Sequence, residues 1–356
     1  MLSSLSFPAL LLIFVLAAAA VWVAGIKLSD TTDVLSETLG LGEALGGLTF
    51  LAVATNLPEI AITASAALQG NLGIATGNIL GGIAIQTVVL VFIDAFGVGG
   101  RYPLTYRAAS LVLVLEGVML IAVLAVTTMG SQQPSWLIFE RVDPASLSIV
   151  ALWVLGLWLI KKARTDLPWQ EKGEAPGGQE EHHGVARSKK RQVAQDKRRS
   201  LTRTGAVFAV SGLVTLVAGV LLEMSGENIA EHIGMTGVLF GSTVLAAATA
   251  LPEISTGITS ARLGDYKLAV SDIFGGNVFL PVLFLLAGLL SGQAALPQAQ
   301  KTDIYLAALG ALLTAIYISG LIFRPSRRFL RIGIESLVVL ILYSLGIAGL
   351  IAVVQG

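Results

Sequence analysis

Two segments of the sequence are near-copies of each other, and each places a proline and a glutamate inside a long apolar stretch. They read LAVATNLPEI at 51–60 and LAAATALPEI at 245–254. A proline leaves one helix carbonyl without its N–H donor, and a carboxylate at membrane depth is energetically expensive. Because both costs occur twice at matching positions, the pattern predicts an ion site built from broken helices at a repeat interface.

The composition is typical of a membrane protein. The chain is 54% hydrophobic and only 13% charged, whereas a soluble domain is about a quarter charged. It has no cysteine and three histidines, which excludes disulfides and disfavours a transition-metal cage. A membrane span needs about 20 apolar residues, and ten stretches qualify: roughly 7–28, 41–69, 72–98, 106–128, 144–162, 204–223, 236–261, 266–291, 302–323 and 330–354.

A charged segment divides the chain into two halves. Residues 161–203 are rich in Lys, Arg, Glu and Gln and carry no apolar period, so we expect a cytoplasmic linker between a first five-span repeat (1–160) and a second (204–356). This placement puts 21 of the 23 basic residues on the cytoplasmic side. The positive-inside rule then predicts a multi-pass protein of the cell (plasma or inner) membrane with both termini outside.

An internal repeat supports this division. Residues 51–82 and 245–276, shifted by 194 positions, are identical at 14 of 32 positions without a gap. Each half has an odd number of spans, so the second half must enter the membrane from the opposite side. The predicted fold is therefore an all-α membrane protein, with ten transmembrane helices in two inverted-topology five-helix repeats and discontinuous helices 2 and 7.

Oxygen atoms gather around the two predicted breaks. The candidate cation ligands there are the side chains of Thr55, Asn56, Glu59, Thr249 and Glu253. With the carbonyls that the prolines leave unpaired, they approach the six to eight oxygens that Ca²⁺ prefers. Without a cation, two buried carboxylates would attract a proton. The alternative is that the threonines only cap the following half-helices and the glutamates are protonated packing residues.

The spans that follow the breaks carry further candidates. They read GNILGGIAIQ at 77–86 and SDIFGGNVFL at 271–280, and their glycine pairs favour close helix packing. Asn78 and Asp272 occupy matching repeat positions. Asp272 shares a helix face with Gly276, so we expect a third acid near the site, as a ligand or behind the ligands. Gln86 is a plausible neighbour.

Three other acids lie within apolar stretches. Asp94 and Glu335 are near the predicted cytoplasmic ends of their spans, so we expect both to reach water. Glu116 lies in mid-span in LVLVLEGVML. It could serve a second ion path or a helix contact.

At the residues described above, the chain resembles the sodium/calcium exchanger family of cation/Ca²⁺ antiporters. That family has ten spans, two inverted repeats, a G-T-S-L-P-E-type signature in each repeat and a G-S-N-type signature on the next span. The resemblance implies that Thr55, Glu59, Thr249 and Glu253 match the central cation ligands. It also implies that the first and sixth spans slide against the rest of the bundle.

The sequence departs from the family at the flanking sodium positions. The signature serines are replaced by Asn56 and Ala250 at the breaks, and by Gly82 and Gly276 on the next spans. The polar position four residues later holds Gln86 in one copy and Leu280 in the other. The central divalent site is therefore better supported than the sodium sites. The departures also favour coupling to protons, or a changed cation, more than a close family match would.

The leading hypothesis is alternating-access antiport of Ca²⁺, or another divalent cation, against Na⁺ or H⁺. The alternatives are a transport-inactive membrane scaffold or regulator of the same fold, and an intramembrane enzyme that uses the glutamates as acid and base. No nucleophile or phosphate-binding loop accompanies them, which disfavours an enzyme. We expect cations and the lipid bilayer as partners, with no nucleic acid and no resident cofactor. The sequence carries no signal of an oligomeric state.

Overall fold

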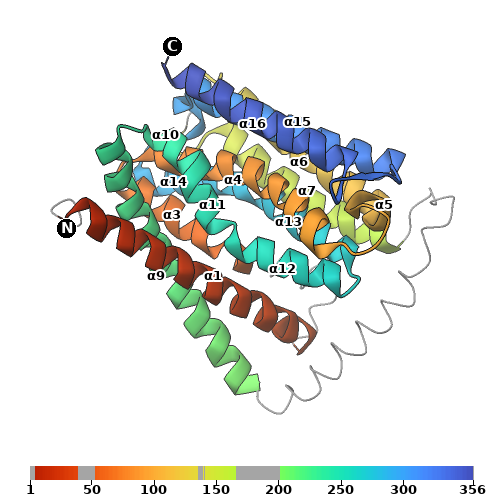
Figure 1. Ribbon diagram of the computed structural model, residues 1–356. Coiled ribbons are helices and arrows are strands. Elements are labelled where there is room, and N and C mark those ends of the chain that lie inside the picture. Colours follow the sequence, from red (N-terminus) through yellow and green to blue (C-terminus); the bar gives the residue numbers. More distant parts are fainter. Residues whose placement is uncertain (1–4, 39–52, 135–138, 140, 166–200, 356) are drawn as a thin grey trace.

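The computed structural model describes residues 5–38, 53–134, 139, 141–165 and 201–355, and these are mostly helical (Figure 1). Eight helical segments within these ranges are long and apolar enough to cross a membrane. Their helices are α1 (Phe7–Thr38), α4 (Leu72–Phe92) continued by η3 (Ile93–Gly97), α6 (Leu111–Gly130), α7 (Pro144–Thr165), α9 (Leu201–Ile233), α13 (Tyr266–Phe279) continued by η7 (Leu280–Val282) and α14 (Leu283–Ser291), α15 (Lys301–Phe323) and α16 (Ile334–Gln355).

A bent pair of helices makes a ninth if the pair is counted as one span. Gly237–Thr249, which comprises α10 (Gly237–Phe240), η6 (Gly241–Leu245) and α11 (Ala246–Thr249), meets α12 (Leu251–Arg262) at an angle of 43°. The helix α3 (Leu57–Leu68) matches α12 at the repeat offset of 194, but is too short to span alone. The predicted span 41–69 lies partly on residues 39–52, which are outside the described residues. The structure therefore describes eight or nine of the ten predicted spans.

Both described ends of the predicted linker 161–203 are helical, so the linker is shorter than predicted. Residues 161–165 belong to α7 and residues 201–203 to α9, and the intervening 166–200 lie outside the described residues. Smaller elements complete the described chain: α5 (Leu104–Ala108), η8 (Leu296–Gln298) and a two-stranded antiparallel hairpin of β1 (Arg328–Phe329) and β2 (Ile332–Gly333).

The long helices α1 and α9 lie against each other on one side of the bundle, opposite α15 and α16 (Figure 1). Each contacts the proline of a broken helix through a glycine. A Cβ atom on Gly25 of α1 would lie 2.6 Å from Cγ of Pro252, and one on Gly219 of α9 would lie 3.0 Å from the carbonyl oxygen of Pro58. Gly25 and Gly219 are themselves 194 residues apart. The absence of Cβ atoms thus allows both helices to approach the half-helices closely.

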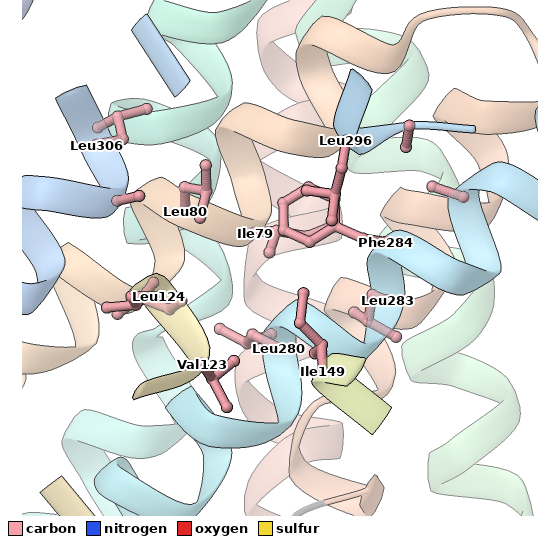
Figure 2. Close-up of a cluster of buried hydrophobic side chains, with 14 of the residues drawn as sticks. Ile79, Leu80, Val123, Leu124, Ile149, Leu280, Leu283, Phe284, Leu296 and Leu306 are labelled. Atoms are coloured by element: carbon pink, nitrogen blue, oxygen red, sulfur yellow. The ribbon is translucent and has the colours of Figure 1, made fainter. Parts of the chain in front are cut away.

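The interior is closely packed around α4, the most buried span. Figure 2 shows its Ile79 and Leu80 near Leu280 and Phe284 from the α13–α14 segment and Leu124 from α6. Outward-facing side chains on α1, α9 and α16 are large and apolar: Leu16, Leu213 and Leu345 are 60–63% exposed. Lipid tails are as apolar as leucine, so this exposure suits a bilayer, and close packing stabilises the interior.

The expectation that Asp94 and Glu335 reach water is wrong, because both are buried. The Asp94 carboxylate accepts hydrogen bonds from backbone N–H groups of Leu104 and Gly333 at 2.9 and 2.6 Å and forms an ion pair with Arg328 at 3.7 Å. Glu335 accepts a short hydrogen bond from Thr105. These acids tie the η3 end of α4 to the β-hairpin and α16, which is a structural role.

Candidate functional site

The two proline-containing segments break at equivalent residues. Asn56 (φ −88°, ψ 15°) precedes α3, and Ala250 (φ −79°, ψ −1°) precedes α12. Both new helices carry proline at the second position. Because proline has no N–H to donate, the carbonyl four residues earlier loses its helical partner. The breaks predicted from the sequence are thus present, with the second resolved along its whole span.

Glu59 and Glu253 lie in the first turns of α3 and α12 and are 0% and 5% exposed. Both oxygens of Glu59 and Oε2 of Glu253 are buried without a hydrogen-bond partner. The two carboxylates lie close enough to repel each other. The positive ends of two helix dipoles favour acids here, but buried carboxylates without hydrogen bonds still need a cation or a proton.

The remaining residues at the breaks are also buried. Thr55 and Asn56 are 6% and 1% exposed, and Thr249 is 1% exposed. The Thr249 hydroxyl donates to the Ala246 carbonyl at 3.1 Å and lies beside the Glu59 carboxylate. Thr249, from the second repeat, thus faces Glu59 from the first, so the two breaks meet at one place.

Asp272 lies on α13 within electrostatic range of Glu253 and is half-buried. It is therefore near the pair, as the helix-face argument predicted. However, the described residues contain no group of three or more His, Cys, Asp or Glu side chains spaced to hold a metal ion. Asp272 thus lies near Glu253 without forming a three-acid cluster with the pair.

Gln86 and Asn56 converge on Gly276, where the family signature has serine. A Cβ atom on Gly276 would lie 3.2 Å from Nδ2 of Asn56 and 3.7 Å from Oε1 of Gln86. At the matching Gly82, the nearest atom is the apolar Cδ1 of Leu280 at 3.4 Å. The two flanks of the site therefore differ: amide groups occupy one, and a leucine occupies the other.

Two buried asparagines lie on α4 and α13. Asn78 is 0% exposed, and neither atom of its amide has a hydrogen-bond partner. It packs at the crossing of α4 with η6, where a Cβ atom on Gly241 would lie 3.2 Å from the Asn78 backbone nitrogen. Asn277 donates to the carbonyl of Ile83 at 3.4 Å. Ile83 and Asn277 are 194 residues apart, so α4 and α13 cross at equivalent positions.

Glu116 has a partner that the sequence did not indicate. The carboxylate is 1% exposed and accepts a hydrogen bond from the Ser271 hydroxyl at 2.8 Å. Ser271 directly precedes Asp272 on α13. Of the two possibilities for Glu116, the helix contact is present in the structure.

The site offers carboxylate, hydroxyl, amide and carbonyl oxygens, without histidine or cysteine. This set suits a hard cation such as Ca²⁺ or Na⁺, or a proton, and it does not suit a soft transition metal. Neither Glu59 nor Glu253 has a basic partner among the described residues, so no ion pair offsets a negative charge at the site.

The chain is similar in sequence and in fold to known membrane proteins. A family model described as sodium/calcium exchanger protein matches residues 9–162 and 204–352. The inner membrane protein YrbG of Escherichia coli K12 is 26% identical over 298 residues, which is 82% of each chain. The human sodium/potassium/calcium exchanger 1 is 34% identical over 109 residues, which is 29% of this chain and 10% of that protein. The crystal structure of the H⁺/Ca²⁺ exchanger CAX superposes with a TM-score of 0.66 at 15% identity, covering 97% of this chain and 87% of that one.

Proposed function

Because the chain belongs to the sodium/calcium exchanger family, in which transporters exchange cations and use no cofactor, we propose that it exchanges Ca²⁺, or another divalent cation, against H⁺ or Na⁺. Glu59 and Glu253 are the shared ligands. Two carboxylates hold one divalent cation or the monovalent charges that replace it, and not both together. This exclusion couples the two fluxes in alternating access.

One observation carries the proposal: two carboxylates from different halves of the chain are buried within electrostatic range of each other, with unpartnered oxygens and no basic partner among the described residues. Removing one such charge from water without a partner costs several kcal/mol. Binding of a cation would offset this cost for both carboxylates. Thr55 and Thr249 supply hydroxyl ligands, and Asp272, Asn78, Asn56 and Gln86 complete or support the shell.

We propose the ten-span, inverted-repeat architecture for the whole chain. The matched bounds of α3 and α12, and of the starts of α1 and α9, support it, since each pair is offset by 194 residues. The distribution of basic residues supports a cytoplasmic 166–200 segment, termini outside and insertion in the cell membrane.

The flanks of the site support a proton as the counter-ion. Leu280 occupies the Gly82 side and leaves no side-chain oxygen there for Na⁺. A proton needs only a carboxylate, so a pH gradient is expected to drive divalent uptake at least as well as a Na⁺ gradient.

The test is ⁴⁵Ca²⁺ uptake into proteoliposomes under a Na⁺ gradient and, separately, under a pH gradient. Uptake in the pH arm at least equal to that in the Na⁺ arm supports proton coupling. Strict Na⁺ dependence without a pH response contradicts it. Absence of flux in both arms, with correctly folded protein, would favour a transport-inactive scaffold.

A further inference from the structure

A row of carboxylates on α9 leads from the surface into the bundle. Glu223, Glu227 and Glu231 are spaced four residues apart, so they share one helix face about one turn apart. Glu223 is 0% exposed, Glu227 is half-buried and Glu231 is exposed. None of the three has a basic partner among the described residues. They lie in the last three turns of α9, where the helix dipole adds negative potential.

Neutral donors from α3 and the start of α4 hold the two inner acids. The Ser65 hydroxyl and the Gln69 amide each donate to Oε2 of Glu223 at 2.7 Å. The Gln69 amide also lies 3.0 Å from the Ser65 hydroxyl and 3.3 Å from its carbonyl. The Asn71 amide donates to Oε1 of Glu227 at 2.6 Å. These bonds fasten the end of α9 to the α3–α4 turn.

These hydrogen bonds leave one carboxylate oxygen without a donor and supply no positive charge. Oε1 of Glu223 is buried without a hydrogen-bond partner, and none of the donors carries a charge. Two adjacent carboxylates, one fully buried, therefore remain without a counter-charge. A fully buried carboxylate oxygen without a donor needs a cation or a proton as its missing partner.

The position relative to the central site is set by α3. Ser65 follows Glu59 by six residues, which is about 9 Å along a helix. Glu223 thus lies between Glu59 and the end of the bundle at which α3 ends. In the proposed topology, this is the outer face.

The other repeat does not carry this arrangement. At the offset of 194, Glu223 corresponds to Ser29 and Gln69 to Leu263. The pair of Asn71 and Glu227 corresponds to Asp265 and Asp33, two acids. The feature therefore belongs to one end of the molecule.

We propose that Glu223 and Glu227 form a second divalent-cation site on the path to Glu59, and that it holds this end of the path closed while empty. This inference rests on the cation exchange proposed above. An arriving cation displaces the N–H donors, and the amides of Gln69 and Asn71 rotate to present their oxygens instead. The same side chains then coordinate the ion and release α9 from the α3–α4 turn.

Binding is tested on the full-length protein with the central site disabled by Glu59→Gln and Glu253→Gln together. Equilibrium dialysis with ⁴⁵Ca²⁺ should detect one remaining weak site, and adding Glu223→Gln should weaken it by roughly tenfold or more. Glu231→Gln, one turn beyond the site and without a bond to α3 or α4, is the matched control and should leave it unchanged. No remaining site, or equal effects of the two variants, would overturn the inference.

Transport with the central site intact tests the path. Glu223→Gln should raise the Ca²⁺ concentration for half-maximal uptake by about fivefold when Ca²⁺ is supplied from the α3 end. The value from the opposite face should not change. An equal shift from both faces would contradict a site at one end. Failure of the central proposal would appear separately, as full transport in the Glu59→Gln variant.

Discussion

The helix α9 contacts the first broken helix at Gly219, which has no side chain. We therefore predict that Gly219→Ala lowers the stability of the protein. Its Cβ atom would lie 2.7 Å from Cβ of Ala61 and 3.0 Å from the carbonyl oxygen of Pro58. A backbone oxygen cannot turn away as a flexible side chain can. Overpacking of this kind costs about 1–3 kcal/mol, and separation of α9 from α3 should also slow exchange.

Two glycines on the same helix provide the reference. Replacing glycine by alanine within a helix gains up to about 1 kcal/mol from backbone propensity. Gly212→Ala would meet its nearest atom at 3.6 Å, and Gly205→Ala would meet nothing within 4 Å, so both should show this gain alone. Thermal unfolding of the purified variants, with Ca²⁺ uptake in parallel, measures the difference. If Gly219→Ala is as stable as Gly212→Ala, the close packing of α9 on α3 is refuted.

Three further predictions concern the flank, the topology and Glu116. Gly82→Ser has ordinary space beside Leu280 and should increase the Na⁺ dependence of uptake, whereas Gly276→Ser displaces the neighbouring amide and should impair uptake. A flux assay under a Na⁺ gradient and under a pH gradient checks both effects. Unchanged Na⁺ dependence in the Gly82→Ser variant would count against the assignment of this flank. A cysteine introduced by Ser188→Cys should resist an impermeant thiol reagent in intact cells and react after permeabilisation, since the native chain has no cysteine; labelling in intact cells would reverse the topology. Ser271→Ala leaves a Glu116 oxygen without its donor and should cost about 1–3 kcal/mol of stability, measured by thermal unfolding, with exchange retained; an unchanged unfolding temperature would refute the contact.

The sequence predicted the features that local chemistry determines. Proline fixed the positions of the breaks, and the repeat of Glu59 and Glu253 indicated that two acids meet. Apolar length located eight or nine of the ten predicted spans, although the expected start of the sixth lies within α9, which begins at Leu201.

Long-range packing could not be read in the same way. Asp94 looked like a boundary residue because its span ends nearby, but Arg328 and the backbone of a distant hairpin bury it. The pairing of Glu116 with Ser271 joins positions 155 residues apart, and no local pattern specifies it. Gly276 appeared to remove a polar group from the site, yet Asn56 and Gln86 lie in the space beside it.

The central claim is that the two buried glutamates bind the transported cation. The direct measurement is ⁴⁵Ca²⁺ exchange in proteoliposomes containing Glu59→Gln or Glu253→Gln, at matched protein incorporation and with Glu231→Gln as control. Each amide keeps the shape of the side chain and removes one charge from a pair that must balance a divalent ion. The account predicts loss of exchange by roughly 100-fold or more in both variants and normal exchange in the control. Near-normal exchange in either glutamate variant, with intact folding, would contradict it.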